Sequence, residues 1–308
     1  MNILFRADSS SNIGTGHIMR DLVLVNQFPN DNIVFATQDL EGNINYKIDE
    51  AGYKVYTLKN NEFEELNFLI KELNIEMIVI DHYKIDYDFE KKLKNENPNL
   101  KIFVFDDTYE KHYSDILLNH NISANKKKYK NLVPKNCELR CGSNYTLLRD
   151  EFFKAKKLKH KIKKDKKTKT IFLAMGGADH SNINIKILKV IKKIRKDKKN
   201  VKVNLVTTSA NKNLKELEEY CKNKKWINLQ KNSNEIAQLM IESDFAIVTP
   251  SVTVNEVYFL SLPMIAIKTA DNQKDIYEYL KKSGLFALKR FNKNKIKKHI
   301  INITERLK

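Results

Sequence analysis

The stretch Asn2-Ile-Leu-Phe-Arg6-Ala-Asp8-Ser-Ser-Ser-Asn-Ile-Gly14-Thr-Gly16-His17-Ile-Met-Arg20-Asp-Leu22 runs from a short apolar segment through a glycine turn into a segment of helical period. Residues 2–5 have the composition of a buried strand. The apolar residues Ile18, Leu22 and Val25 recur at helical spacing and predict the inner face of a helix. A strand, a glycine turn and a helix in this order predict a βα unit.

Such units recur along both halves of the chain, which predicts α/β folds with parallel sheets. The spacing predicts an N-terminal domain over residues 1–153, a Lys-rich linker over 154–169, a C-terminal domain over 170–290 and a basic, helical tail over 291–308. The linker holds ten lysines and one acid, so we expect it to be exposed and extended, as a solvated face rather than an anion-recruiting patch. Strands are expected at residues 2–5, 33–36, 54–57, 77–80, 102–105, 116–118, 171–175, 201–206, 227–229, 245–248, 264–267 and 285–288.

Composition limits the class of ligand. The chain has 308 residues and a net charge of +18, which favours anionic partners. Only seven of its 56 basic residues are Arg, the residue that sequence-specific nucleic-acid readers favour, so no nucleic-acid partner is expected. Three cysteines without a C-x-x-C pair favour a reducing compartment and no zinc site. An early charge and the lack of a long apolar run predict a cytoplasmic protein with no membrane span.

Four of the eight glycines fall in two strand-to-helix turns, as Gly14 with Gly16 and as Gly176 with Gly177. Helix N-termini at such turns favour anions, so both turns are candidate phosphate sites, although tight turns alone would also explain the glycines. The first turn lacks the Lys of a Walker loop and the third glycine of a dinucleotide fingerprint. These absences argue against an ATPase and an NAD enzyme.

His17 is the strongest catalytic candidate. It begins the first helix at the carboxyl edge of a strand, where open α/β sheets bind ligands. A helix N-terminus disfavours the imidazolium form, so His17 is suited to be a general base. His112, His120, His160, His180 and His299 carry no local signal beyond that of surface histidines.

The second glycine turn ends at Asp179, and its double glycine predicts a diphosphate cradle unless Asp179 or Ser181 only caps the next helix. Downstream, Asn255 and Glu256 could bind a phosphate and the hydroxyls of a ribose. Thr253 and Glu256 also have the spacing of a capping box, which would explain the acid without a ligand.

Two polar clusters, Asp81-His82-Tyr83 and Asp106-Asp107, follow predicted strands and should lie at the same sheet edge as His17. They could line one site. Their spacing matches no common metal motif, so solvated loop carboxylates are expected rather than metal ligands.

The opening stretch resembles that of the UDP-2,4-diacetamido-2,4,6-trideoxy-β-L-altropyranose hydrolases, which make a precursor of pseudaminic acid. Further similarity is carried in order by Asp81-His82-Tyr83, Asp115-Ile-Leu-Leu-Asn119, Cys141-Gly142-x-x-Tyr145-x-Leu-Leu-Arg149-x-Glu151-Phe152, Met175-Gly176-Gly177-x-Asp179 and Val254-Asn255-Glu256. It spans residues 1–290 and implies the GT-B fold, in which two Rossmann-like domains face a central cleft. Ala7 and Ala178 stand at variable positions, and the tail lies beyond the resemblance.

The resemblance also implies roles for residues. His17 would activate water, with no cofactor and no metal, to displace UDP from a UDP-sugar with inversion. UDP would be held by Gly176, Gly177, Asn255 and Glu256, and Tyr83 would lie near the sugar. The remaining substrate-binding residues would be Arg6, Asp8, Gly14 and Gly16.

Three other functions stay open. A MurG-like glycosyltransferase would use His17 to deprotonate an acceptor hydroxyl in place of water. A UDP-N-acetylglucosamine 2-epimerase of the hydrolysing type would eliminate UDP instead. An RNA-binding protein would bind through its lysines.

Overall fold

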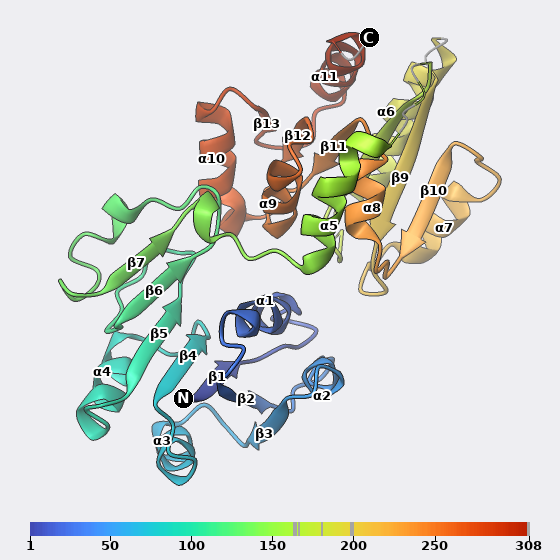
Figure 1. Ribbon diagram of the computed structural model, residues 1–308. Coiled ribbons are helices and arrows are strands. Elements are labelled where there is room, and N and C mark those ends of the chain that lie inside the picture. Colours follow the sequence, from blue (N-terminus) through green and yellow to red (C-terminus); the bar gives the residue numbers. More distant parts are fainter. Residues whose placement is uncertain (163–164, 166, 180, 198–199, 307–308) are drawn as a thin grey trace. The chain divides into compact units, whose positions relative to one another are not determined.

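A computed structural model describes residues 1–162, 165, 167–179, 181–197 and 200–306 (Figure 1). The chain forms two compact units, Met1–Leu147 and Leu148–Lys308. The boundary therefore lies a few residues before the one that the sequence predicted, because the helix that starts at Asp150 packs in the second unit.

Unit 1 is built on a parallel sheet with the strand order β3-β2-β1-β4-β5-β6-β7. Apolar clusters lie on both faces of this sheet, and its central strands are therefore rich in Ile, Val and Phe rather than alternating with polar residues. Its strands are β1 Asn2–Ala7, β2 Asn32–Gln38, β3 Lys54–Leu58, β4 Met77–Asp81, β5 Lys101–Phe105, β6 Ile116–Asn119 and β7 Glu138–Cys141. Its α-helices are α1 Gly16–Leu24, α2 Tyr46–Glu50, α3 Phe63–Glu72 and α4 Tyr87–Glu96.

Unit 2 contains, in its described residues, a parallel sheet with the order β10-β9-β8-β11-β12-β13. The central pair β8 and β11 is flanked on both sides, as in a Rossmann-like sheet. Its strands are β8 Lys169–Ala174, β9 Val201–Thr207, β10 Ile227–Lys231, β11 Phe245–Val248, β12 Met264–Ile267 and β13 Phe286–Leu288. Its α-helices are α5 Asp150–Leu158, α6 Ile183–Lys196, α7 Leu214–Cys221, α8 Ile236–Ile241, α9 Val252–Phe259, α10 Lys274–Lys282 and α11 Lys293–Arg306.

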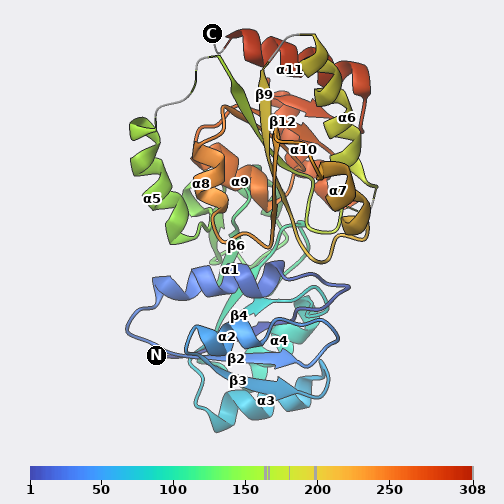
Figure 2. The ribbon, with the colours of Figure 1, turned by 90° about the vertical axis from the view of Figure 1, so that its right-hand side faces the viewer.

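Strands occur at every predicted position, which confirms the α/β class with parallel sheets. Strand β7 was missed because Glu138 and Arg140 give this edge strand a polar sequence. The tail forms helix α11, which lies beside α6 in Figure 2 and buries Ile296, Ile300 and Ile303 in the same cluster as α6.

The Lys-rich segment departs from the expected extended linker. Residues 154–158 belong to helix α5, and Lys159–Lys161 continue as a 3-10 turn. The helix is stable despite its like charges because Phe152 and Ala155 face the core while the lysines of 154–158 point to solvent. The segment is thus a solvated helical face over these residues; Lys163, Lys164 and Lys166 lie outside the described residues.

Helix α1 differs from the expectation in one respect. Its buried face comprises His17, Ile18, Asp21 and Leu24, and Leu22 is only partly buried. The carboxyl of Asp21 has no hydrogen-bond partner among the described residues, and burial raises its pKa well above the usual value. Because α1 buries an acid and a histidine beside the sheet, packing alone does not explain its sequence.

Candidate active site

Helix α1 and strand β4 bring a histidine and a carboxylate together. Strand β1 pairs with β4 so that Ala7 lies opposite Asp81, and the turn after β1 leads to His17 on α1. Nδ1 of His17 lies 2.7 Å from Oδ1 of Asp81. The expectation that the Asp81 cluster and His17 share one sheet edge is confirmed.

The contact with Asp81 assigns the proton on His17. The pKa of Asp81 lies well below its usual range, because Arg20 outweighs the effect of burial, so this carboxylate can only accept. Nδ1 must therefore carry the hydrogen, and the 3.2 Å approach of Arg20 Nη2 to the same atom is not a hydrogen bond. In the neutral form of the ring, Nε2 is then the acceptor. Unlike several other side-chain nitrogens of the described residues, Nε2 of His17 is not both buried and without a hydrogen-bond partner.

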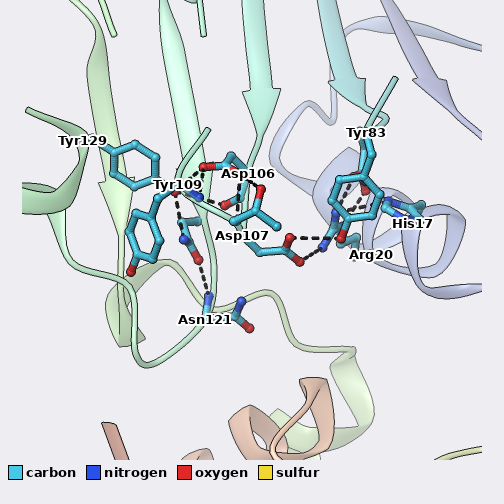
Figure 3. A network of polar contacts seen from close by, with 11 residues as sticks. His17, Arg20, Tyr83, Asp106, Asp107, Tyr109, Asn121 and Tyr129 are labelled. Carbon is cyan, nitrogen blue, oxygen red and sulfur yellow. Dashed lines mark hydrogen bonds and ion pairs between the residues drawn. The ribbon is translucent and has the colours of Figure 1, made fainter. Parts of the chain in front are cut away.

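Arg20 organises the carboxylates around His17. Its guanidinium donates to both oxygens of Asp81 and reaches Asp107 Oδ2 at 3.4 Å, while its Cζ lies 4.8 Å from the centre of the Phe105 ring. Figure 3 shows the guanidinium between His17 and Asp107. The sequence argument missed Arg20, although its position three residues after His17 places both on one helix face.

Tyr83 closes this group. Its ring meets the His17 ring edge to face, with centroids 5.1 Å apart, and its hydroxyl donates to Asp107 Oδ1 at 3.0 Å (Figure 3). The pKa of Tyr83 is raised by desolvation of its hydroxyl and by the charge of Asp107, although much of the residue is exposed, so the hydroxyl stays protonated at neutral pH. Because 63% of Tyr83 is exposed, this side chain can touch a ligand beside His17.

Arg6 and Asp8 lie below the surface. Their exposed fractions are 0% and 1%, and two hydrogen bonds of 2.7 and 2.9 Å join them. Asp8 also accepts from the backbone N–H of Gln38 and contacts His82 Nε2 at 3.0 Å. These contacts hold the ends of β1, β2 and β4 together, and direct ligand binding by either residue stays a prediction.

The first glycine turn uses Gly14 for its backbone conformation. Gly14 has φ +87, where a side chain would be strained, and its N–H donates to the Ser10 carbonyl at 2.8 Å. That N–H is therefore not free for an anion. Gly16 starts α1 and would have open space around a Cβ, so a ligand can approach the backbone there.

The second glycine turn follows β8 in unit 2. Gly176 has φ +80, and a Cβ on Gly177 would lie 3.0 Å from Oγ1 of Thr208. The carboxylate of Asp179 accepts from the backbone N–H groups of Ile183 and Asn184 at 2.7 and 3.0 Å. Asp179 rather than Ser181 thus caps α6, and these two N–H groups are not free for an anion.

Asn255 and Glu256 lie on α9. The capping-box prediction is wrong, because α9 begins at Val252 with Ser251 as N-cap, so Thr253 already lies inside the helix. Burial raises the pKa of Glu256 to about 7, which Arg149 opposes from 3.5 Å and Glu151 reinforces. A carboxyl in this state, without a capping role, is typical of a binding site.

The expectation of surface histidines fails at two positions. His120 and His112 have exposed fractions of 1% and 7%. Neither ring nitrogen of His120 has a hydrogen-bond partner among the described residues, and burial lowers its pKa to about 4. His180 lies outside the described residues.

The described residues contain neither a metal-binding cluster nor a helix that could span a membrane. No group of three or more His, Cys, Asp or Glu side chains is placed to hold a metal ion. No described helix has the length and the apolar composition needed to cross a membrane.

The hydrolase of UDP-2,4-diacetamido-2,4,6-trideoxy-beta-L-altropyranose from Campylobacter jejuni is 40% identical over 284 residues, which cover 92% of this chain and 97% of the relative. The chain belongs to this hydrolase family. A family model described as lipid-A-disaccharide synthetase also matches, over residues 145–271. The hydrolase family relation covers both units, whereas this second match lies almost wholly in unit 2.

Solved structures show the fold of this hydrolase family member. MurG of Acinetobacter baumannii has a TM-score of 0.66 and 10% identity, and the match covers 99% of this chain and 93% of MurG. The spinosyn rhamnosyltransferase SpnG also has a TM-score of 0.66 and 10% identity, with coverage of 100% and 95%. The chain therefore has the GT-B-like α/β fold with two Rossmann-like units.

Proposed function

We propose that the chain hydrolyses UDP-2,4-diacetamido-2,4,6-trideoxy-β-L-altropyranose to the free sugar and UDP, through attack of water on the anomeric carbon with inversion. The family relation supports this substrate. The observation that carries the reaction is the ring of His17, held through Nδ1 by Asp81 at 2.7 Å with Nε2 left to accept a proton.

In the proposed reaction, Nε2 of His17 takes a proton from water as the oxygen attacks the anomeric carbon. The imidazolium that forms is stabilised by the adjacent Asp81, which remains ionised beside Arg20. A positioned base of this kind contributes about 10² to 10⁴ in rate. Tyr83, in edge contact with the ring, is proposed to border the sugar.

The leaving group explains why no second acid is needed. UDP leaves as a stable anion, so the proposed site omits the acid with which inverting glycosidases protonate a sugar oxygen. We assign the diphosphate to the backbone N–H groups of Gly176 and Gly177, and the ribose to Asn255 and Glu256. Backbone donors of this kind stabilise developing negative charge without a metal ion.

In unit 1, Gly16 is proposed to let the substrate approach the start of α1. Gly14 is proposed to act by shaping the glycine turn. The buried pair of Arg6 and Asp8 is proposed to shape the same edge of the sheet. Their roles are thus to support the sugar site, and contact with the substrate is proposed mainly for Gly16 and Tyr83.

A reaction in ¹⁸O-labelled water tests the proposal. The purified chain is mixed with the diacetamido UDP-sugar in buffer that contains no acceptor, and the products are followed by mass and proton NMR spectra. We expect UDP and a free sugar that carries one ¹⁸O at carbon 1, with the anomer of opposite configuration appearing first. A chain that releases UDP only after an acceptor is added would be a glycosyltransferase, and deuterium uptake at carbon 2 in D₂O would indicate an epimerase.

A further inference from the structure

A second polar pocket of unit 1 adjoins the group around His17. It has a volume of about 400 Å³ and lies between the segment that follows β4 and the segment that follows β5. Its lining includes Asp81 and Tyr83, both of which contact His17, but not His17 itself. The pocket therefore touches the direct neighbours of the proposed base but not the base itself.

One lining residue of the pocket, His112, is paired with a buried carboxylate outside the lining. Nδ1 of His112 lies 2.7 Å from Oε1 of Glu90, and the backbone N–H of Tyr113 donates to Oε2 at 2.6 Å. Glu90 has an exposed fraction of 0% and is fixed on α4. The arrangement repeats that of His17 and Asp81, with a buried carboxylate that orients a ring through Nδ1.

The other ring nitrogen of His112 is an unpaired atom. Nε2 is buried and has no hydrogen-bond partner among the described residues, although His112 lines the pocket. A buried polar atom without a partner is unfavourable, and such atoms in native proteins call for an explanation. A ligand group that enters the pocket and displaces the side chains that cover Nε2 would supply the missing partner.

The lining of the pocket limits the chemistry of that group. Ile85, Tyr87 and Phe105 provide apolar surface beside His112. An acetamido group fits both features, because its methyl can pack on apolar walls while its amide can donate through N–H or accept through C=O. It can therefore pair with Nε2 whether the imidazole is neutral or charged, whereas a hydroxyl would leave the apolar walls uncovered.

We propose that this pocket receives the acetamido group on carbon 4 of the sugar and that His112 hydrogen-bonds it, as a specificity-determining residue. This inference rests on the proposed function, which places carbon 1 at His17. The acetamido group on carbon 2 is adjacent to the reacting carbon, while that on carbon 4 lies farther along the ring. Because Asp81 and Tyr83 line the pocket and contact His17, which does not line it, we assign the pocket to the more distant group.

Two isosteric variants separate hydrogen bonding from folding. His112→Asn keeps an N–H near the position of Nδ1 for Glu90 but removes the atom at Nε2, and His112→Gln places an amide near Nε2. With the diacetamido donor, we expect H112N to raise KM about 10-fold to 100-fold, as for loss of a buried hydrogen bond, with kcat within about threefold. H112Q should recover part of this loss, and inhibition by UDP should be unchanged in both.

A matched donor supplies the control. It carries the acetamido group on carbon 2 and a hydroxyl on carbon 4, and it should be a poor substrate whose KM is the same for wild type and H112N. Equal losses on both donors, or a loss in kcat alone, would overturn the proposal. Asp88→Trp enlarges an exposed lining residue instead, and should raise KM for the diacetamido donor if H112N does not fold.

A binding measurement distinguishes failure of this inference from failure of the proposed function. In a His17→Asn background, calorimetry gives the affinity for the intact diacetamido donor and for UDP without turnover. Addition of H112N should weaken the affinity for the donor about 10-fold or more and leave the affinity for UDP unchanged. If wild type fails to hydrolyse the donor, the proposed function is wrong. The difference in donor affinity with and without H112N still supports or overturns the assignment of the pocket to the acetamido group.

Discussion

His17 and Asp81 are separated by 64 positions in the chain, yet Nδ1 of the imidazole and Oδ1 of the carboxylate lie 2.7 Å apart. The parallel pairing of β1 with β4 creates this contact, because it sets Ala7 opposite Asp81 and the turn after β1 returns α1 across the strand ends. Arg20 then holds Asp81 from the next turn of the same helix. Each of these contacts leads to a measurable expectation.

The first prediction concerns His17→Asn. The amide can still donate to Asp81, but no atom replaces Nε2, so kcat should fall about 10² to 10⁴-fold. The dissociation constant for UDP, measured by calorimetry, should stay within about twofold. His160→Asn is the matched control, since His160 is exposed on a 3-10 turn of unit 2 and should behave as wild type. Turnover of H17N close to that of H160N would exclude His17 as the base.

The second prediction concerns Asp81→Asn. Because Asp81 is 1% exposed and Arg20 only 11%, removal of the negative charge leaves the guanidinium with Asp107 alone, at 3.4 Å, and should lower the free energy of unfolding by about 3 kcal/mol. It also replaces one acceptor oxygen with an NH₂ donor while Arg20 still competes for the remaining oxygen, so the tautomer of His17 is no longer fixed and kcat should fall at least about 10²-fold. Urea unfolding and steady-state turnover measure the two effects.

Asp107→Asn is the comparison for that variant. Asp107 is 24% exposed and meets Arg20 only at 3.4 Å, so its loss should cost less than about 1 kcal/mol. Equal destabilisation by the two substitutions would show that the ion pair of Asp81 and Arg20 stabilises the fold no more than that of Asp107 and Arg20.

The third prediction concerns Gly177→Ala. The new Cβ would meet Thr208 at 3.0 Å from Oγ1 and 3.2 Å from Cγ2, so the turn or Thr208 must move by a few tenths of an ångström. We expect the affinity for UDP to fall about 10-fold, consistent with the loss of about 1.4 kcal/mol from one displaced backbone hydrogen bond. Thr208→Ala removes both contacting atoms, and the double variant should regain most of the affinity. Failure of this rescue would place the diphosphate elsewhere.

The fourth prediction is a pH dependence set by Glu256. Its pKa in the folded chain, about 7, exceeds the unfolded value of 4.5, so the native state binds the extra proton between these pH values. The free energy of unfolding should therefore fall as pH rises from about 4.5 through 7, by at most about 3 kcal/mol. Chemical denaturation at pH 5 and pH 8 measures this difference.

Glu256→Gln should abolish most of that slope, because the amide does not titrate. Glu151→Gln is a matched control: it removes the neighbouring charge that raises the pKa of Glu256, so the slope should shrink without vanishing. A slope in E256Q as steep as in wild type would assign the pH dependence to another group.

The strands were predictable because each is an apolar segment bounded by polar residues or glycine, and burial on both faces of a sheet requires such segments. Edge strand β7 could not be predicted, since it meets a neighbour on one side only and its residues are polar. Helix α5 was misjudged for a related reason. The lysine charges suggested an extended segment, but two buried side chains, Phe152 and Ala155, fix the helix.

Within the site, the sequence indicated which residues to examine but not how they pair. His17, Tyr83 and the two glycine turns could be named from their places at strand ends. The spacing of three residues from His17 could have pointed to Arg20, but the contact of Arg20 with Asp81 and that of His112 with Glu90 could not be predicted, because each joins segments that are distant in the sequence.

The sequence alone determined the order of strands and helices, the two glycine turns and the position of His17 at a helix start, because these depend on neighbours a few residues away. Tertiary structure decided which carboxylate holds which ring, which acid stays protonated and which nitrogen is left unpaired. Those properties depend on burial and on strand pairing between distant segments, which set the local dielectric and the partners of each buried group.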